Sequence, residues 1–359
     1  MLVAETNSQL SKKSGDIGAL VIFDRNVDFI TPLMSQFTYS GFMDETFGIK
    51  NNTVAVDAKI VQIEESKQDE RKNMPTKKIL MLNNDFVYAE IKDLHNVAVA
   101  EQLERRLVKV QELKGRINRQ EKDLAKIQEV LATTSRIQKE MPLVSNHIAI
   151  REYFRQLTSK PAHFFSIKAE QSILDCVNSH EVQDYANVLI AKQAKLEKVL
   201  RLLCLQSQIE NGLRIPILDS FKREILHVYG FENIITLNNL EKIGLLKREA
   251  GKSTWKNLDK QLKLINTEVN VSVPNDAAYA YDGYCPILVR LVEKLFLKGG
   301  WKTIQDALQL LDGATVYDEQ AGVDIWNMGR KQAMVLFFIG GITYGEIAAI
   351  RYLAKTYNR

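Results

Sequence analysis

The segment GALVIFDRNVDFITPLMSQFTYSGFMDETFGI, residues 18–49, contains the feature that decides the fold. It opens with an uninterrupted apolar run, Ala19 to Phe23, which is too short for a helix and is followed by Asp24. Such a run is typical of a strand that is buried on both faces, as in a parallel sheet. A second apolar run of strand length, Met334 to Phe338, lies near the other end of the chain.

Residues with a helical pattern separate these two runs. From about residue 85 to about residue 265, apolar residues recur at spacings of three, four and seven with few breakers. The simplest topology pairs the two runs in one parallel sheet that a helical insertion interrupts. We therefore predict an α/β fold with a large all-helical insertion and a parallel sheet formed by the two ends of the chain. The predicted division is a disordered leader at 1–16, an α/β domain at 17–84 and 274–359, and a helical insertion at 85–273.

A polar turn follows the first predicted strand. We expect Arg25 and the carboxylates of Asp24 and Asp28 to form a hydrogen-bonded ionic cluster. This cluster would fix the turn beneath Thr31 and Pro32, where proline disfavours helix at the preceding residue. A phosphatase-like enzyme, in which one carboxylate attacks phosphate, is a weaker alternative. That site requires its second carboxylate two residues after the first, where this chain has an asparagine.

Other motifs that could indicate an enzyme are incomplete. The sequence GKST at 251–254 lacks the earlier glycine of a phosphate-binding loop, and Gly340-Gly341 lacks the third glycine of a dinucleotide fingerprint. Thr343 and Glu346 instead predict a capping box for the last helix. The three cysteines and five histidines show no metal-ligand spacing. We therefore expect no catalysis, no cofactor and no metal.

The composition is that of an ordinary soluble globular protein. A chain of 359 residues with 45% hydrophobic and 26% charged residues suits about two domains. Its net charge of +4 argues against a dedicated nucleic-acid binder. No apolar run reaches the roughly 18 residues of a membrane span, and the N-terminus has no signal-peptide core. We expect a cytoplasmic protein that associates with membranes through its partners.

One apolar stripe runs along residues 95–140. It fits a long amphipathic helix, or two helices folded back on each other near residues 115–122, with charged side chains on the other face. A solvated helical hairpin and a partner-binding rod both explain this pattern. A coiled-coil scaffold that self-associates through residues 95–140 is a further alternative. The stripe includes Leu103, Leu107, Val110, Ile117, Leu124 and Ile127.

Several stretches match the motifs of a known family. Residues 23–33 read Phe-Asp-Arg-x-x-Asp-x-x-Thr-Pro-Leu, residues 38–45 read Thr-Tyr-x-Gly-x-x-Asp-Glu, and residues 337–351 read FFIGGITYGEIAAIR. These motifs resemble those of the SM (Sec-one/Munc-eighteen) family, the syntaxin-binding chaperones of SNARE assembly. Stretches in the middle of the chain are similar to the vacuolar protein sorting branch of the family, which serves in the tethering complexes HOPS and CORVET. They lie at 199–207, 222–226 and 237–246.

The resemblance implies a non-enzymatic function. In this family the helical insertion holds SNARE helices in register and templates their four-helix bundle. The resemblance therefore assigns SNARE binding to the stripe on residues 95–140, because a helix laid along a groove is a recurrent recognition mode. It implies vesicle docking and fusion in endosome-to-lysosome or vacuole transport. It also implies a peripheral location on late endosome and lysosome or vacuole membranes.

The same resemblance implies a second partner surface at the turn that contains Tyr229, Phe231 and Ile234. This turn would dock a helical class C tether subunit of the vacuolar protein sorting sixteen branch, with Phe231 and Ile234 as apolar anchors. A local helix–helix core closed by these two residues explains the sequence equally well. Compared with the family, we expect the chain to lack the N-terminal domain and the extreme C-terminus.

Overall fold

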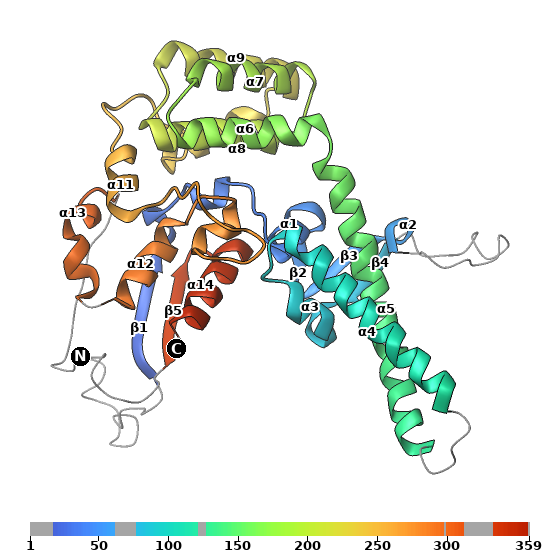
Figure 1. Ribbon diagram of the computed structural model, residues 1–359. Coiled ribbons are helices and arrows are strands. Elements are labelled where there is room, and N and C mark those ends of the chain that lie inside the picture. The colour runs from blue at the N-terminus through green and yellow to red at the C-terminus, as the bar shows by residue number, and fades with distance from the viewer. Residues whose placement is uncertain (1–16, 62–76, 121–126, 298, 312–332, 358–359) are drawn as a thin grey trace, which may run out of the picture.

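The computed structural model describes residues 17–61, 77–120, 127–297, 299–311 and 333–357 (Figure 1). Strands β1 (Ile17–Asp24) and β5 (Ala333–Ile339) pair in parallel, with Leu20 beside Val335 and Asp24 beside Ile339. The two ends of the chain thus form a parallel sheet, and helices fill most of the sequence between them. This arrangement confirms the predicted fold class.

The parallel sheet is buried on one face only. Phe23 on β1 packs against Phe338 on β5, with ring centroids 5.3 Å apart, and both join the main hydrophobic core. On the opposite face, Leu20 is 62% exposed, Ile22 58% and Phe337 57%. The prediction of a strand buried on both faces is therefore wrong for the described residues, because their helices pack against a single face.

A second sheet, absent from the predicted fold class, forms near the N-terminus. Helix α1 (Tyr39–Phe47) leads into the antiparallel strands β2 (Ile49–Lys50), β3 (Thr53–Asp57) and β4 (Lys77–Met81). This sheet has its own core, to which α1, the first turns of α4 (Asn96–Gln120) and the second half of α5 (Ile127–Thr158) also contribute. Two short helices flank it: α2 (Ala58–Val61) and α3 (Phe86–Ile91).

A two-helix hairpin projects from this second core (Figure 1). Helix α4 (Asn96–Gln120) packs along α5 (Ile127–Thr158). Helix α5 is continuous although Pro142 lies inside it.

A compact helical unit follows the hairpin, and the chain then returns to the parallel sheet (Figure 1). Among the residues that the structure describes, no helix is long and apolar enough to span a lipid bilayer. The helices of the unit are α6 (Pro161–Leu174), α7 (Ser179–Ala191), α8 (Leu196–Glu210), α9 (Ile215–Tyr229), α10 (Asn233–Lys242) and α11 (Trp255–Leu262). The return segment contains α12 (Ile287–Leu295), α13 (Gln305–Leu308) and α14 (Tyr344–Thr356).

Candidate functional site

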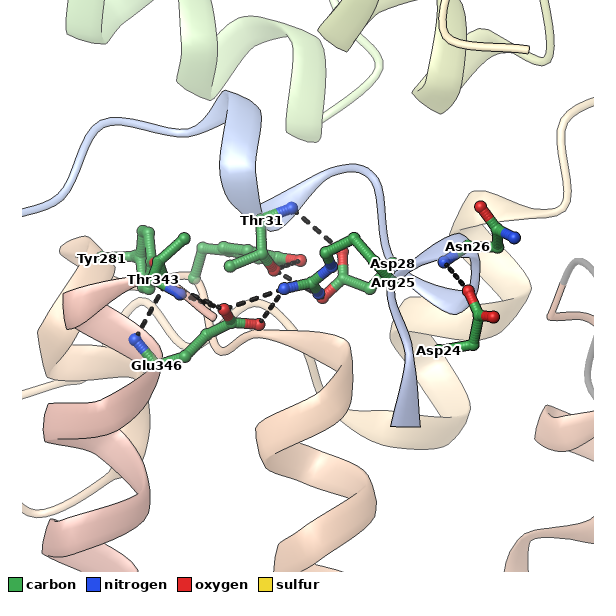
Figure 2. A network of polar contacts seen from close by, with 9 residues as sticks. Asp24, Arg25, Asn26, Asp28, Thr31, Tyr281, Thr343 and Glu346 are labelled. Carbon is green, nitrogen blue, oxygen red and sulfur yellow. Dashed lines mark hydrogen bonds and ion pairs between the residues drawn. The ribbon is translucent and has the colours of Figure 1, made fainter. Parts of the chain in front are cut away.

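The polar turn after β1 is built around Arg25 (Figure 2). Its Nη1 donates to both carboxylate oxygens of Glu346 at 2.9 Å, and its Nη2 lies 3.3 Å from Asp28 Oδ2. All three side chains are buried. Burial alone would lower the pKa of Arg25, but the two carboxylates outweigh it and raise that pKa above its ordinary value. A charged arginine thus ties the first strand to the last helix.

Asp28 fixes the next turn of the chain. Its Oδ1 accepts a hydrogen bond from the Thr31 backbone N–H at 3.0 Å, and its Oδ2 accepts one from Thr31 Oγ1 at 2.6 Å. Thr31 Oγ1 also lies 3.1 Å from the hydroxyl of Tyr284, which is buried in the main core. Pro32 follows on the surface, within a short 3-10 turn. The cluster therefore holds the bend beneath Thr31 and Pro32.

Asp24 lies outside this cluster, contrary to the sequence-based expectation. Its Oδ1 accepts a hydrogen bond from the Asn26 backbone N–H at 2.8 Å, on an exposed turn that points away from Arg25 (Figure 2). Asp24 caps the 3-10 turn that begins at the next residue, so its carboxylate is directed forward along the chain to the Asn26 N–H. Glu346 takes its place beside Arg25. The predicted capping box between Thr343 and Glu346 is confirmed, and the same carboxylate serves both partners.

The glycines after β5 allow this close approach. Gly340 has a φ of 94°, and a Cβ atom at this position would lie 2.7 Å from Arg25 Cβ. At Gly345 in the first turn of α14, a Cβ atom would lie 2.8 Å from the ring of Tyr281. The hydroxyl of Tyr281 lies 2.6 Å from Thr343 Oγ1. Gly340 and Gly345 are therefore explained by close packing against Arg25 and Tyr281, without a dinucleotide-binding role.

The geometry of the cluster is that of a structural clasp. Arg25 and Thr31 occupy both oxygens of Asp28, and Asp24 points elsewhere, so the two aspartates do not face a common site. The phosphatase-like alternative required them to do so. Within the described parts of the chain, no group of three or more histidine, cysteine or acidic side chains could hold a metal ion.

The apolar stripe of the hairpin is used inside the protein where its side chains are described. Leu103 and Val110 are each 2% exposed, and Leu107 is half-buried. Leu103 and Leu107 pack with the core of the antiparallel sheet. These three side chains therefore hold the hairpin together, instead of facing a partner as the resemblance implied. Leu124 lies outside the described residues, as do the side chains of Ile117 and Ile127.

A charged cavity of about 400 Å³ lies beside the hairpin. Arg106 is central to it, because its Nε donates to Glu140 Oε1 at 2.6 Å and its Nη1 pairs with Glu90. The guanidinium also lies over the ring of Phe86, 5.1 Å from the centroid. The remaining charged lining residues give the cavity a small positive excess: Arg105, Lys109, Glu112 and Arg136.

The turn between α9 and α10 presents apolar side chains at the surface. Phe231 is 70% exposed, Ile234 46% and Ile235 65%. Tyr229 is anchored, because its hydroxyl donates to the carbonyl oxygen of Ala194 at 2.7 Å. Exposure on this scale does not fit a local helix–helix core closed by Phe231 and Ile234. The two residues that were expected to act as anchors therefore lie on the surface.

Comparison with known proteins identifies the family. Residues 2–359 match the Sec1 family. The chain is 35% identical to vacuolar protein sorting-associated protein 33A of Rattus norvegicus, over 94% of this chain and 57% of that protein. It is 34% identical to the vacuolar protein-sorting-associated protein 33 homolog of Arabidopsis thaliana, over 95% of this chain and 57% of that protein. The chain thus spans under two thirds of these relatives' length.

Solved structures agree at the level of the fold. The SM protein Vps45 in complex with the Qa SNARE Tlg2 matches with a TM-score of 0.62 and 15% identity, over 99% of this chain and 58% of that one. Sly1p in complex with an N-terminal peptide of Sed5p matches with a TM-score of 0.53 and 15% identity, over 94% of this chain and 54% of that one. With the motifs at both ends of the chain and the family match along its length, these findings place this protein in the Sec1 family.

Proposed function

We propose that this chain binds SNARE helices during vesicle docking and fusion. In this proposal it is the SM subunit of a HOPS- or CORVET-type tethering complex in endosome-to-lysosome or vacuole transport, and it acts without catalysis. Membership of the Sec1 family and the names of the relatives support this function. The observation that carries it is the projecting hairpin of α4 and α5 with a charged cavity along its side.

The hairpin offers a long surface along which a SNARE helix can lie in this proposal. Helix α4 has 25 residues, which corresponds to a length of about 37 Å at 1.5 Å per residue. Because Leu103 and Val110 are buried, the SNARE contact falls in this proposal on the exposed side of α4 and on the cavity. Val97 and Val108 are 58% and 46% exposed. They are eleven residues apart, close to three helical turns, and so lie on one face as apolar contacts.

The charged cavity supplies the polar part of this contact. Lys109 has no carboxylate partner among the described residues, and Arg136 Nε lies 3.7 Å from Glu140 on a mostly exposed side chain. In this proposal Lys109 pairs with an acidic side chain on an incoming helix, and Arg136 exchanges its long, mostly exposed contact with Glu140 for another such side chain, which would set the register of the helix. Val97 and Val108 would then supply affinity, and the lysine and arginine would supply specificity.

The SNARE contact is tested by fluorescence anisotropy of a labelled Qa-SNARE helix titrated with the whole chain. Lys109→Glu with Arg136→Glu reverses two cavity charges, and we expect affinity to fall about tenfold or more. A matched control, Lys256→Glu with Lys260→Glu, makes the same charge change on exposed residues of α11. We expect it to bind like the wild type. Equal binding by the cavity variant and the control would contradict this SNARE site.

The exposed turn between α9 and α10 is the second part of the proposal. We assign docking of the helical class C tether subunit to Phe231 and Ile234, with Tyr229 holding the turn in place. Their exposure supports this assignment, because large apolar side chains that are exposed next to one another mark protein interfaces. Through this subunit the chain would be carried, in this proposal, to late endosome and lysosome or vacuole membranes.

A further inference from the structure

A second exposed apolar surface lies on α6. Phe164 is 63% exposed and Phe165 is 51% exposed, and their rings touch edge to face with centroids 5.8 Å apart. Large neighbouring apolar side chains that remain exposed together indicate an interaction site. Neither residue belongs to the hairpin or to the turn between α9 and α10. The pair therefore needs an explanation of its own.

Lysines are concentrated in the segment that holds this pair of phenylalanines and in a second segment that packs beside it. Residues 159–169 and 192–198 contain five lysines and a single acidic residue, Glu197. The two segments therefore carry an excess of four positive charges, whereas the rest of the chain has equal numbers of basic and acidic residues. All five lysines are exposed, and none pairs with a carboxylate within the described part of the chain. They are Lys160, Lys168, Lys192, Lys195 and Lys198.

Contacts between helices bring the two segments together. The hydroxyl of Tyr185 on α7 donates to the carbonyl oxygen of Ala162 on α6 at 3.3 Å. Burial lowers the pKa of His163, and the nearby charge of Lys198 on α8 lowers it further. The first turns of α6 and α8 are therefore neighbours, and the loop that carries Lys192 and Lys195 joins α7 to α8 at the same end of the unit.

We propose that this face of α6, with Phe164, Phe165 and the five lysines, binds directly to the surface of an anionic membrane. Aromatic side chains on a basic surface insert into the headgroup boundary, and lysines near that surface are attracted by acidic lipids. The lysines are spread over α6, α8 and the loop before α8, and they have no carboxylate partners. This arrangement fits a diffuse layer of negative headgroups better than the single row of carboxylates on a partner helix.

The apolar turn between α9 and α10 provides a contrast within the same protein. Residues 228–242 contain Glu232 and Glu241 but only one basic residue, Lys242. That surface has exposed apolar side chains but no surrounding basic residues, which suits a protein partner. The surface on α6 has exposed apolar side chains and lysines together. Charge therefore distinguishes the two exposed apolar surfaces and assigns them different partners.

Membrane contact at α6 would also orient the hairpin. Helix α5 ends at Thr158 and α6 begins at Pro161, so the membrane-facing residues follow the hairpin directly (Figure 1). A chain held at this face would present the hairpin in a defined direction relative to the bilayer. This role is independent of the proposed SNARE and tether contacts, because it uses none of their residues.

The proposal is tested by co-sedimentation of the whole chain with lipid vesicles. We expect the wild type to bind vesicles of phosphatidylcholine with phosphatidylserine, and to bind phosphatidylcholine vesicles weakly. Two variants, Phe164→Ser with Phe165→Ser and Lys192→Glu with Lys195→Glu, should each lose affinity for the acidic vesicles by about tenfold or more. Added salt should weaken wild-type binding, because it screens exposed charges.

Matched controls separate this surface from general effects. Phe231→Ser with Ile234→Ser removes two exposed apolar side chains elsewhere, and Lys256→Glu with Lys260→Glu makes the same change of charge elsewhere. Both should sediment like the wild type. If the wild type fails to bind acidic vesicles, the proposal is wrong and this face belongs to a protein partner. Equal losses in the controls and the α6 variants would also overturn it. The lysine variant, Lys192→Glu with Lys195→Glu, keeps the test valid if the phenylalanine variant misfolds.

Discussion

Replacing Arg25 by methionine removes the clasp between β1 and α14 while keeping most of the side-chain volume. The loss leaves the carboxylates of Asp28 and Glu346 without their cation, and both side chains are 0% exposed. Removing one partner of a buried ion pair costs about 3–5 kcal/mol, because a buried charge remains uncompensated. A domain is typically stable by about 5–15 kcal/mol, so this single change would take a large share of the total.

The assay is urea denaturation of the wild type, Arg25→Met, Glu346→Gln and the double variant, followed by circular dichroism. The double variant should be less destabilised than the sum of the single variants by about 2 kcal/mol, because it removes both charges of the strongest contact. Arg155→Met is a control, since its pair with Glu152 is exposed and its loss should not be measurable. If Arg25→Met costs less than about 1 kcal/mol, or if the effects of the two substitutions add, then the clasp does not stabilise the fold as we argue.

Three further predictions follow from individual contacts. Glu170 accepts hydrogen bonds from the backbone N–H and Oγ of Ser35, and burial raises its pKa to about 7. Because this pKa lies above the usual 4.5, the stability from Glu170 is present at low pH and is lost as pH rises through about 7, by roughly 1–3 kcal/mol. Glu170→Gln should flatten the melting temperature between pH 5 and 8, and an unchanged pH profile would refute this. Gly340→Ala should destabilise by about 2 kcal/mol or more in the same urea assay, because of its positive φ and the contact with Arg25. Gly115→Ala, with open space around the added methyl group inside α4, should be neutral or stabilising, and equal losses would contradict the steric argument. Phe231→Asp with Ile234→Lys should abolish pull-down of the tether subunit's helical domain with an unchanged circular dichroism spectrum, and retained binding would remove this site assignment.

The parts of the fold that the sequence predicts depend on local patterns. The runs at 19–23 and 334–338 lack the helical period and have strand length, so both strands could be recognised. The capping box at Thr343 and Glu346 is also a local signal, since its two residues are one turn apart. The sequence also indicates a short strand at 78–82, which corresponds to β4, but the pairing of β2, β3 and β4 in one antiparallel sheet was not predicted because the charged segment between β3 and β4 gives no hairpin signal.

Contacts between distant residues explain the errors. Arg25 and Glu346 are 321 positions apart, and no pattern in one sequence pairs them, so Asp24 seemed the natural partner. The periodicity of the hairpin identified Leu103 and Val110 as apolar positions of one face. It could not tell whether α5 and a neighbouring sheet or a foreign helix covers that face, because both produce the same spacing.

The proposed SNARE-chaperone function is tested most directly by whether the chain holds two SNARE helices at once. Native mass spectrometry of the whole chain with a Qa-SNARE helix and an R-SNARE helix of the vacuolar or lysosomal route measures this. We expect a complex with one copy of each component, which the Lys109→Glu with Arg136→Glu variant fails to form. A chain that binds neither helix, and instead forms a dimer through residues 95–140, would contradict the account and favour a self-associating scaffold.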